Sequence, residues 1–314
     1  MTAIDAQGYY IGIDGGGTRS TLLIDFEDGG APICVQGGPL NICSVPQQEA
    51  GASLEKLFRQ AADAVRARGG QRCKGIGAGV AGAADPRTIP FFRESIGRIF
   101  PGIPLTVETD AAAALYGAHL DREGIVLVSG TGSSCFGGKG GRFHLAGGGG
   151  HIIDDGGSGY AIGRDILSAV LKALDKRIPP TLLSEAVQKQ YGIASRGDII
   201  AFVYDPHTRK DAIAACAPLI TAACQAGDQA ALEIARNAAE HLFEIASAVV
   251  TVLELPQGPI AYTGSVLKKE PYVRKFLKEK LDTGWGNMVY YEAKADAAAG
   301  AVLMARWAAA GGSL

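Results

Sequence analysis

Two short glycine-rich stretches that also carry hydroxyl side chains have the composition of phosphate-binding turns. The first comprises Gly15, Gly16, Gly17 and Thr18, and the second comprises Gly130, Thr131, Gly132 and Ser133. Successive backbone N–H groups in such turns form anion-binding concavities, to which Thr and Ser hydroxyls add donors. A single turn of this kind is usually a plain hairpin turn in which glycine supplies a positive φ. Because the pattern occurs twice, we expect the two turns to hold the β- and γ-phosphates of a nucleotide.

Asp14 comes directly before the first turn, at the end of an apolar segment that begins at Tyr9. A carboxylate in this position is suited to hold Mg²⁺, mostly through water molecules, because Mg²⁺ gives up its hydration shell reluctantly. The alternative is an aspartate that starts the turn by bonding to its own backbone. The adjoining phosphate turn favours the metal site, so we predict that Asp14 contributes to binding Mg²⁺.

Asp110 lies in the segment VETDAAAAL, where a strand is expected to end and a helix to begin. Phosphoryl transfer to a hydroxyl uses such a carboxylate to position the hydroxyl and to accept its proton. An N-cap of the helix would also explain an aspartate here. Glu108 precedes it by two residues and would point the same way on a regular strand. We predict that Asp110, rather than Glu108, is the catalytic base.

A third glycine-rich stretch, residues 147–163, ends where a helix is expected to start. Its spacing imitates a dinucleotide-binding fingerprint, but no βαβ unit with a ribose-binding acid about 20 residues later follows it. Its polar members are better candidates for orienting a sugar or another substrate, and they are His151, Asp154 and Asp155. A helix cap explains Asp154 equally well.

Two further places lie where a loop meets a regular element. Asn41 follows the first group of strands and, taken alone, is typical of a turn residue. The segment from Tyr262 to Val266 ends a strand and starts a helix, a place that can cover a nucleotide base, although a plain strand-to-helix turn has the same pattern.

The elements that must position these residues alternate between strand and helix patterns. Residues 9–26 predict a hairpin around the first turn, and residues 46–68 predict a helix with apolar residues at helical spacing. Residues 124–138 repeat the order of strand, glycine-rich turn and strand. This weak repeat predicts a duplicated α/β protein in which each half opens with a glycine-rich hairpin. Later segments predict helices over residues 267–281 and 295–309, whereas the helices between residues 180 and 255 are expected to be scaffold without chemistry.

Composition excludes several classes of protein. The chain has 314 residues, enough for two domains, and its net charge of −2 indicates neither a nucleic-acid partner nor a membrane-surface partner. The first residues lack the basic start and apolar run of a signal peptide, and the apolar segment 297–310 is too short to span a bilayer. The six cysteines show no metal-binding spacing, so we expect reduced, buried thiols in a cytoplasmic protein.

Taken in order, the motifs GIDGGGTRS, GVAGA, VETDAAAAL, IVLVSGTGSS, GGGGHIIDDGGSGY and TGSV resemble those of eukaryotic-type N-acetylglucosamine kinases, within the BadF/BadG/BcrA/BcrD ATPase family. The resemblance extends from Tyr10 to about Arg306. It implies the actin-like fold of sugar kinases and Hsp70, with two duplicated, ribonuclease H-like α/β domains around a nucleotide cleft. It also implies transfer of the γ-phosphoryl group of ATP, with Mg²⁺, to the 6-hydroxyl of an amino sugar such as N-acetylglucosamine or glucosamine.

The resemblance implies roles for single residues as well. Asp110 matches the base that acts on the sugar hydroxyl, and Gly264 and Ser265 match the turn on the adenosine side. The positions that match sugar contacts are Asn41, Thr131 and Asp155. The family implies one domain of residues 1–115 with 296–314 and another of residues 116–295, closure of the two around the substrates, and a homodimer.

The sequence departs from the kinase pattern at four places in these motifs. Gly149 replaces a Trp, Asp154 a Gly, Gly156 a Glu and Ser134 an Asn. These changes alter a wall of the substrate pocket, so the sugar stays open among N-acetylglucosamine, glucosamine, N-acetylmuramic acid and other hexoses.

Two other functions occur on the same fold. Energy-coupling activator ATPases of the family bridge a 4Fe–4S cluster with cysteines, and the closest pair here, Cys216 and Cys224, lies in an alanine-rich stretch that predicts core packing. A sugar-responsive repressor would need a DNA-binding extension, whereas this sequence starts directly with the first hairpin.

Overall fold

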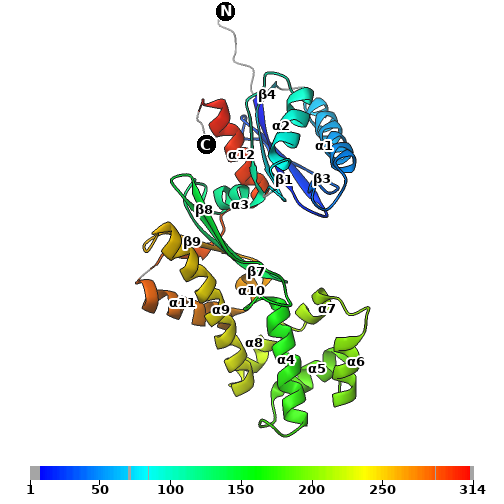
Figure 1. Cartoon of the computed structure of the whole chain (residues 1–314), viewed down its shortest axis with the longest axis vertical. Coiled ribbons are helices and arrows are strands. Elements are labelled where there is room, and N and C mark those ends of the chain that lie inside the picture. The colour runs from blue at the N-terminus through cyan, green and yellow to red at the C-terminus, as the bar shows by residue number, and fades with distance from the viewer. Residues whose placement is uncertain (1–7, 70–71, 84, 287, 312–314) are drawn as a thin grey trace, which may run out of the picture. The chain divides into compact units, whose positions relative to one another are not determined.

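The computed structural model describes residues 8–69, 72–83, 85–286 and 288–311, which form two units (Figure 1). The first unit comprises the chain up to Glu123 and the chain from Ala293 onward. The second unit is the continuous segment Gly124–Glu292. None of the described helices has both the length and the apolar character needed to cross a membrane.

Each unit is built around one sheet. In the first unit the strands are β1 (Gly8–Gly15), β2 (Ser20–Phe26), β3 (Ile33–Gly37), β4 (Arg72–Val80) and β5 (Leu105–Thr109). In the second unit they are β6 (Gly124–Ser129), β7 (Ser133–Lys139), β8 (Arg142–Gly147), β9 (Ile260–Thr263) and β10 (Tyr290–Glu292).

The helices divide between the units in the same way. The first unit contains α1 (Gln47–Ala67), α2 (Thr88–Ile99), α3 (Asp110–His119) and α12 (Ala297–Ala309). The second unit contains α4 (Gly159–Leu174), α5 (Leu182–Tyr191), α6 (Arg196–Tyr204), α7 (Lys210–Ala214), α8 (Leu219–Gln225), α9 (Gln229–Leu253), α10 (Ser265–Lys269) and α11 (Pro271–Trp285).

The two sheets have the same topology. The strand order is β3-β2-β1-β4-β5 in the first unit and, read in the same sense, β8-β7-β6-β9-β10 in the second. In each sheet the first three strands of the unit pair antiparallel, and the last two run parallel to the first. The duplication predicted from the weak internal repeat is therefore present in the fold.

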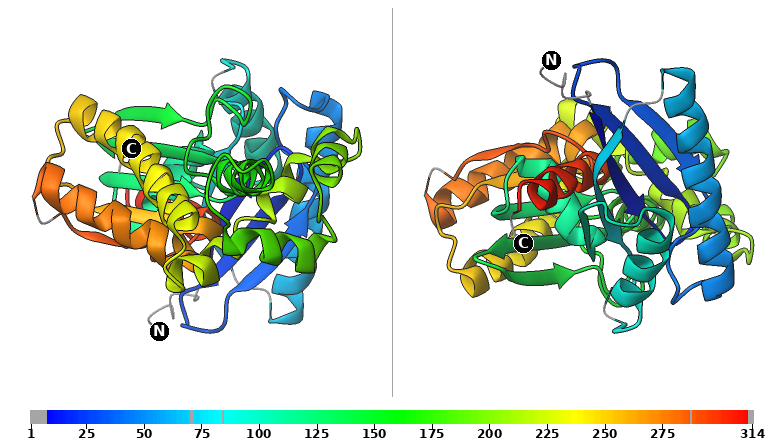
Figure 2. Two further views of the ribbon diagram at one scale, coloured as in Figure 1. Left: turned by 90° about the horizontal axis from the view of Figure 1, so that it is seen from below. Right: turned by 90° about the horizontal axis from the view of Figure 1, so that it is seen from above.

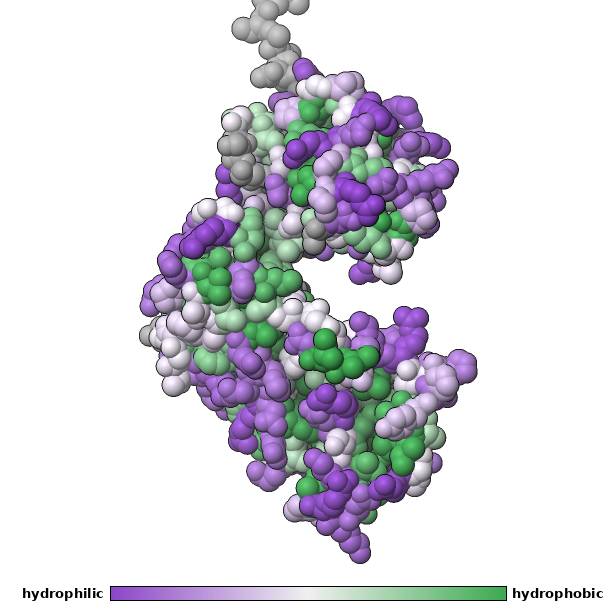
Figure 3. All heavy atoms as spheres, viewed as in Figure 1, coloured by the Kyte–Doolittle hydropathy of each residue, from purple (hydrophilic) through white to green (hydrophobic). Residues whose placement is uncertain are grey.

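Helices cover both faces of the first sheet. The apolar positions predicted for α1 are buried at helical spacing, among them Leu54, Leu57 and Phe58, while the solvent-facing side of the helix is hydrophilic (Figure 3). Side chains alternate along a strand, so Ile11 and Ile13 belong to the core that α1 and α2 cover, whereas Tyr10 packs with residues of α12. Helices α1 and α12 lie on opposite faces of this sheet (Figure 2).

In the second unit, α9 packs against the sheet, α11 packs against α9, and α4 to α8 extend the same apolar core. Cys216 and Cys224 are buried in this core, as core packing predicted. The expectation that every cysteine is buried is wrong for Cys34 and Cys43, which are exposed.

The single helix expected over residues 267–281 is wrong. The structure has the short helix α10 and then α11, separated at Glu270. Proline at position 271 disfavours helical backbone in the residue before it, which ends α10, and Pro271 itself is well suited to the first position of α11.

Candidate active site

The parallel strands of the first unit end together at one edge of its sheet. In the registers of β1 with β4 and of β4 with β5, Asp14 lies opposite Gly79, and Val80 lies opposite Thr109. Asp14, the first glycine-rich turn and Asp110 therefore come to the carboxyl edge of the sheet, which is where open α/β sheets bind ligands.

The first turn joins β1 to β2 and leaves its backbone open. Its closing hydrogen bond runs from the Gly16 N–H to the Arg19 carbonyl oxygen, at 3.1 Å. A positive φ, the plain hairpin explanation, is wrong here, because Gly15, Gly16 and Gly17 all lack one. A Cβ on Gly16 would lie only 2.7 Å from the Arg19 oxygen, whereas Gly17 is exposed with no atom within 3.7 Å of that position. The bare backbone at Gly17 is accessible to a ligand, as is Thr18 beside it.

Asp14 carries a carboxylate in unfavourable surroundings. Burial raises its pKa, and the negative charges of Asp110 and Asp296 raise it further, while Arg19 acts in the opposite direction. The ionised form of Asp14 is thus destabilised in the protein alone. A cation near this group would relieve both the burial of charge and the repulsion.

Asp110 is not the N-cap of its helix. Thr109 caps α3, because its side chain accepts a hydrogen bond from the Ala112 N–H at 2.9 Å. Asp110 is the first helical residue and accepts only from the neighbouring Ala111 N–H, at 2.9 Å, within the described residues. The capping explanation for Asp110 is therefore wrong, and its carboxylate has acceptor capacity left for a ligand.

Glu108 lies in different surroundings from Asp110. Because Asp110 already belongs to α3, the strand alternation that would align the two side chains stops at Thr109. Burial raises the pKa of Glu108, which Arg93 opposes, and the charge of Glu108 in turn raises the pKa of Tyr116. Only Asp110 of the two acts on Asp14.

Asn41 lies next to the first turn. Its side-chain oxygen accepts from the Cys43 N–H at 2.9 Å, which makes it the turn residue that its position suggested. Its side-chain nitrogen faces Gly17, since a Cβ on Gly17 would lie 3.9 Å from it. Gly82, at φ +79°, leaves room for the same side chain, because a Cβ there would lie 2.3 Å from the Asn41 oxygen. The turn thus holds the amide beside the candidate phosphate site.

In the second unit, the second turn and the third glycine-rich stretch form one structure. The hydroxyls of Ser129 and Ser133 donate to the carbonyl oxygens of Gly157 and Gly156, each at 2.8 Å. The Gly130 carbonyl oxygen accepts from the Gly159 N–H at 2.7 Å, at the start of α4. Two stretches separated by more than 20 residues are therefore fixed against each other, with Thr131 exposed at the tip of the turn.

Asp155 is the strained residue of this structure. It is buried, at 5% exposure, and has a left-handed backbone with φ +58°, which a residue other than glycine rarely adopts. Its carboxylate accepts from the Ser133 N–H at 3.4 Å and lies 3.0 Å from the place of a Cβ on Gly132. Such strain clusters at functional sites, where the surrounding structure enforces it.

Asp154 does not cap α4. Ser158 does so, accepting from the Ala161 N–H at 3.1 Å, so the capping explanation for Asp154 is wrong. The Asp154 carboxylate instead accepts from the Gly149 N–H at 2.9 Å. His151 packs edge-on against Tyr160, with ring centroids 4.8 Å apart.

The departures from the kinase motifs are matched by neighbouring side chains. The Asp154 carboxylate occupies the space of a Cβ on Gly149, at 2.9 Å, and the His241 ring occupies that of a Cβ on Gly156, at 2.6 Å. Each of the two glycines thus lies against a larger side chain that occupies the space of its missing Cβ.

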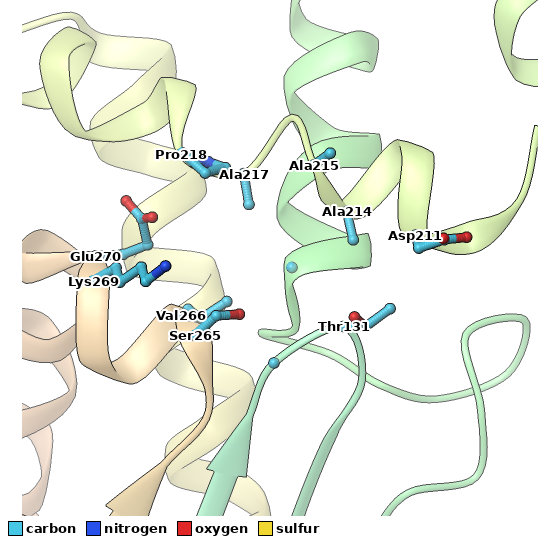
Figure 4. Close-up of a pocket in the computed structure, with 12 residues that line it drawn as sticks. Thr131, Asp211, Ala214, Ala215, Ala217, Pro218, Ser265, Val266, Lys269 and Glu270 are labelled. Atoms are coloured by element: carbon cyan, nitrogen blue, oxygen red, sulfur yellow. The ribbon is translucent and has the colours of Figure 1, made fainter. Parts of the chain in front are cut away.

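Gly264 brings the β9–α10 turn against the second glycine-rich turn. It has φ +94°, and a Cβ on it would lie 2.2 Å from the Ser129 carbonyl oxygen. Next to this contact is a pocket of about 240 Å³ (Figure 4). Its lining residues come from the two turns, from the α4 start and from helices α7, α8 and α10 and their flanks: Gly130, Thr131, Gly159, Asp211, Ala214, Ala215, Ala217, Pro218, Ser265, Val266, Lys269 and Glu270.

The pocket is lined in part by residues of the 180–255 stretch, for which the sequence predicted only scaffold helices. Asp211 and Ala214 lie on the side of the pocket away from Lys269, and Pro218 lies nearer to Lys269 and Glu270 (Figure 4). No local pattern in the sequence marks these residues, because the stretch is alanine-rich and resembles ordinary helix core. The pocket exists only once the α7–α8 region is folded against α10.

Comparisons with known proteins show the family to which the chain belongs. The chain matches the model of the BadF/BadG/BcrA/BcrD ATPase family over residues 11–305. The N-acetylmuramic acid/N-acetylglucosamine kinase of Clostridium acetobutylicum is 33% identical over 95% of this chain and 98% of that protein. The N-acetyl-D-glucosamine kinase of Dictyostelium discoideum is 30% identical over 94% of this chain and 97% of that protein.

Solved structures give the same result. A candidate N-acetylglucosamine kinase from Chromobacterium violaceum is 26% identical and superposes with a TM-score of 0.66 over 95% of this chain and 98% of that chain. The predicted fold class, two duplicated actin-like α/β domains, is confirmed. With matches over nearly the whole length, the chain belongs to the BadF/BadG/BcrA/BcrD ATPase family.

Proposed function

We propose that this chain is an ATP-dependent kinase that transfers the γ-phosphoryl group to the 6-hydroxyl of an amino sugar, with N-acetylglucosamine as the first candidate. The observation that carries the proposal is the placement of the Asp110 carboxylate. Thr109 caps α3, so Asp110 is not used as a cap, and the charge of Asp110 acts on Asp14 beside the first glycine-rich turn. Two full-length relatives named as amino-sugar kinases support the same reaction.

In this mechanism the Asp110 carboxylate accepts a hydrogen bond from the sugar hydroxyl and orients its oxygen toward the γ-phosphorus. Asp110 takes the proton as the new O–P bond forms, while the bond from the γ-phosphorus to the bridging oxygen breaks and ADP leaves with that oxygen. The N–H groups of the first turn, with the Thr18 hydroxyl, bind phosphate oxygens. The second turn, residues 130–133, binds phosphate oxygens in the same way. Because charge is spread over the transferred group, most of the acceleration comes from positioning and from these dipoles.

Mg²⁺ fits the surroundings of Asp14. The raised pKa of this carboxyl reflects burial and the charges of Asp110 and Asp296, which a cation would offset. In the described part of the chain, no three His, Cys, Asp or Glu side chains are grouped to enclose a metal ion. This suits Mg²⁺, which keeps several waters and takes one or two carboxylates together with substrate phosphates. Bound with the nucleotide, it would neutralise phosphate charge, and Asp14 would orient its waters.

We assign the sugar contacts to Asn41, Thr131, His151 and Asp155, beside Asp110. The free amide nitrogen of Asn41 and the exposed hydroxyl of Thr131 are donors for sugar hydroxyls. Asp155 is held rigidly by the second turn, and a rigid acceptor favours one orientation of a ring hydroxyl. The adenosine side belongs to Gly264, Ser265 and the pocket next to them.

The test is an ADP-release assay with MgATP against N-acetylglucosamine, glucosamine, N-acetylmuramic acid, N-acetylmannosamine and glucose. We expect turnover with one amino sugar, a 6-phosphate product identified by mass spectrometry and NMR, and a loss of about 10²- to 10⁴-fold in Asp110→Asn. Glu108→Gln is the matched control, since it also removes a half-buried carboxylate near the same edge. A rate of ADP release that does not depend on any of the sugars would refute the proposal. A turnover rate that is unchanged in Asp110→Asn would refute it as well.

We further propose that the chain acts as a cytoplasmic homodimer with domains of residues 1–115 plus 296–314 and 116–295. The support for these points is the resemblance of the sequence motifs to those of the kinase family. A purified chain that sediments at the monomer mass at micromolar concentration would refute the dimer.

A further inference from the structure

Glu270 occupies an N-cap position without acting as a cap. It precedes Pro271 at the start of α11, yet its side chain makes no capping hydrogen bond. Glutamate is not among the favoured N-cap residues, whose short side chains reach the first helical N–H groups. The Glu270 side chain instead lines the pocket shown in Figure 4, and the residue is buried, at 4% exposure.

The buried carboxylate is only partly satisfied. Within the described residues it accepts one hydrogen bond, from the Thr221 hydroxyl to Oε2. The Glu270 backbone is fully used, since its N–H donates to the Val266 oxygen at 2.8 Å and its carbonyl accepts from the Arg274 N–H at 3.2 Å. An ionised carboxylate accepts at two oxygens, so Oε1 has capacity left for a donor on a ligand. Oε1 makes no hydrogen bond within the described residues and is not fully enclosed, so a donor on a ligand in the pocket can reach it.

The rest of the pocket suits a flat aromatic ring. Ala214, Ala217, Pro218 and Val266 give it apolar walls, and the backbone of the second turn forms another side (Figure 4). Ligand pockets combine apolar walls with a few polar groups that fix orientation, and Glu270 is the polar group buried deepest here.

We propose that Glu270 is the residue that selects adenine, through a hydrogen bond from the exocyclic amine of the base to its Oε1. The inference deepens the proposed ATP-dependent function and rests on it. A 6-oxopurine such as hypoxanthine or guanine presents an acceptor oxygen where adenine presents the amine. That oxygen would face the carboxylate without a proton between them, so such nucleotides are rejected. Thr221 is the positioning residue, because its hydroxyl fixes the other carboxylate oxygen.

The test compares diphosphates, which cannot be turned over: ADP, IDP and purine-riboside diphosphate, each titrated calorimetrically with Mg²⁺ into the full chain. We expect ADP to bind at least about 10-fold more tightly than IDP, because a site built to bond a polar group rejects the analogue that leaves it unpaired. Purine-riboside diphosphate, which lacks the amine but adds no repulsion, should lie between them. This comparison needs no variant, so it does not depend on a mutant that folds.

Variants then assign the preference to a residue. Glu270→Gln should bring the ADP/IDP ratio close to one, because an amide can donate to the 6-oxo group, and Thr221→Val should lower the ratio less. Glu279→Gln, an exposed glutamate on the same helix, is the matched control and should keep the ratio. Equally tight binding of ADP and IDP, or a Glu270→Gln variant that keeps the affinity ratio of the native protein, overturns the role of Glu270. The proposed nucleotide function would stand in either case. No binding of any diphosphate overturns the proposed nucleotide function as well.

Discussion

At the scale of single residues, the negative charges of Asp14, Asp110 and Asp296 in the first unit repel one another. Burial and the charges of Asp110 and Asp296 raise the pKa of Asp14 in the folded protein. A carboxyl with a higher pKa in the folded than in the unfolded state takes up its proton first in the fold. It therefore stabilises the fold at low pH, and that contribution is lost as the pH rises through the folded-state pKa. At neutral pH and without a cation, ionised Asp14 lowers the free energy of unfolding.

Asp14→Asn should consequently raise the Tm at pH 7 in chelator-treated protein, and the gain should shrink toward zero as the pH falls below the ordinary aspartate range. Added Mg²⁺ with ADP should stabilise the native protein more than the variant, and turnover in Asp14→Asn should drop by about 100-fold or more, because several kcal/mol of charge stabilisation are lost. Scanning calorimetry at several pH values measures the first effect. A lower Tm in the variant at pH 7 without metal would contradict the assignment.

Residue-scale prediction from the sequence has a clear limit here. Thr109 and Asp110 are adjacent, and both are good N-cap residues, so the sequence could not decide which one caps α3. The outcome depends on where β5 stops, and it frees Asp110. Glu270 and Asp211 were not predicted for another reason. They line the same pocket although they are more than 50 residues apart in the sequence. Local composition does not encode such a meeting.

At the scale of elements, small residues let two helices lie directly on the first sheet. A Cβ on Gly12 would lie 2.2 Å from the Ala298 oxygen of α12, and one on Gly77 would lie 2.0 Å from the Ala301 oxygen. Where α12 crosses α3, a Cβ on Gly300 would lie 1.8 Å from the Ala113 oxygen. The sequence predicted strand and helix at these places, but the close approach that requires glycine appears only when strand and helix are assembled.

This packing predicts opposite effects of one substitution on two helices. Gly300→Ala should destabilise the chain by several kcal/mol, because backbone rather than a flexible side chain occupies the space of the new methyl group. Gly97→Ala in α2 should stabilise it by about 0.5–1 kcal/mol, since no atom lies within 4 Å of the new Cβ and alanine is the better helix former. Urea denaturation measures both, and two changes of equal sign would show that the α3–α12 crossing is not this tight.

At the scale of the whole molecule, duplication gives each unit its own sheet and its own core. The largest core cluster of the first unit runs from Tyr9 to Val107, that of the second from Ile125 to Met288, and no residue belongs to both. The first unit is also discontinuous in sequence, because α12 returns to β1 and β4 after the second unit is complete. Two cores of this kind make a single all-or-none transition unexpected.

We therefore expect the ligand-free chain to unfold with a calorimetric enthalpy larger than the van't Hoff enthalpy. Gly300→Ala should lower only the unfolding temperature of the first unit, because its clash lies at the α3–α12 crossing. Gly97→Ala should raise the unfolding temperature of that same unit.

ADP should raise the unfolding temperature of the second unit, which contains the whole pocket proposed for the adenine base. The free energy of unfolding of this unit should increase by the mass-action term RT ln(1 + [L]/Kd). Addition of the sugar substrate together with MgADP, which the proposed reaction binds with residues of both units, should bring the two transitions together. A single transition with equal enthalpies in the ligand-free chain, shifted as a whole by either glycine variant, would mean that the two cores unfold as one.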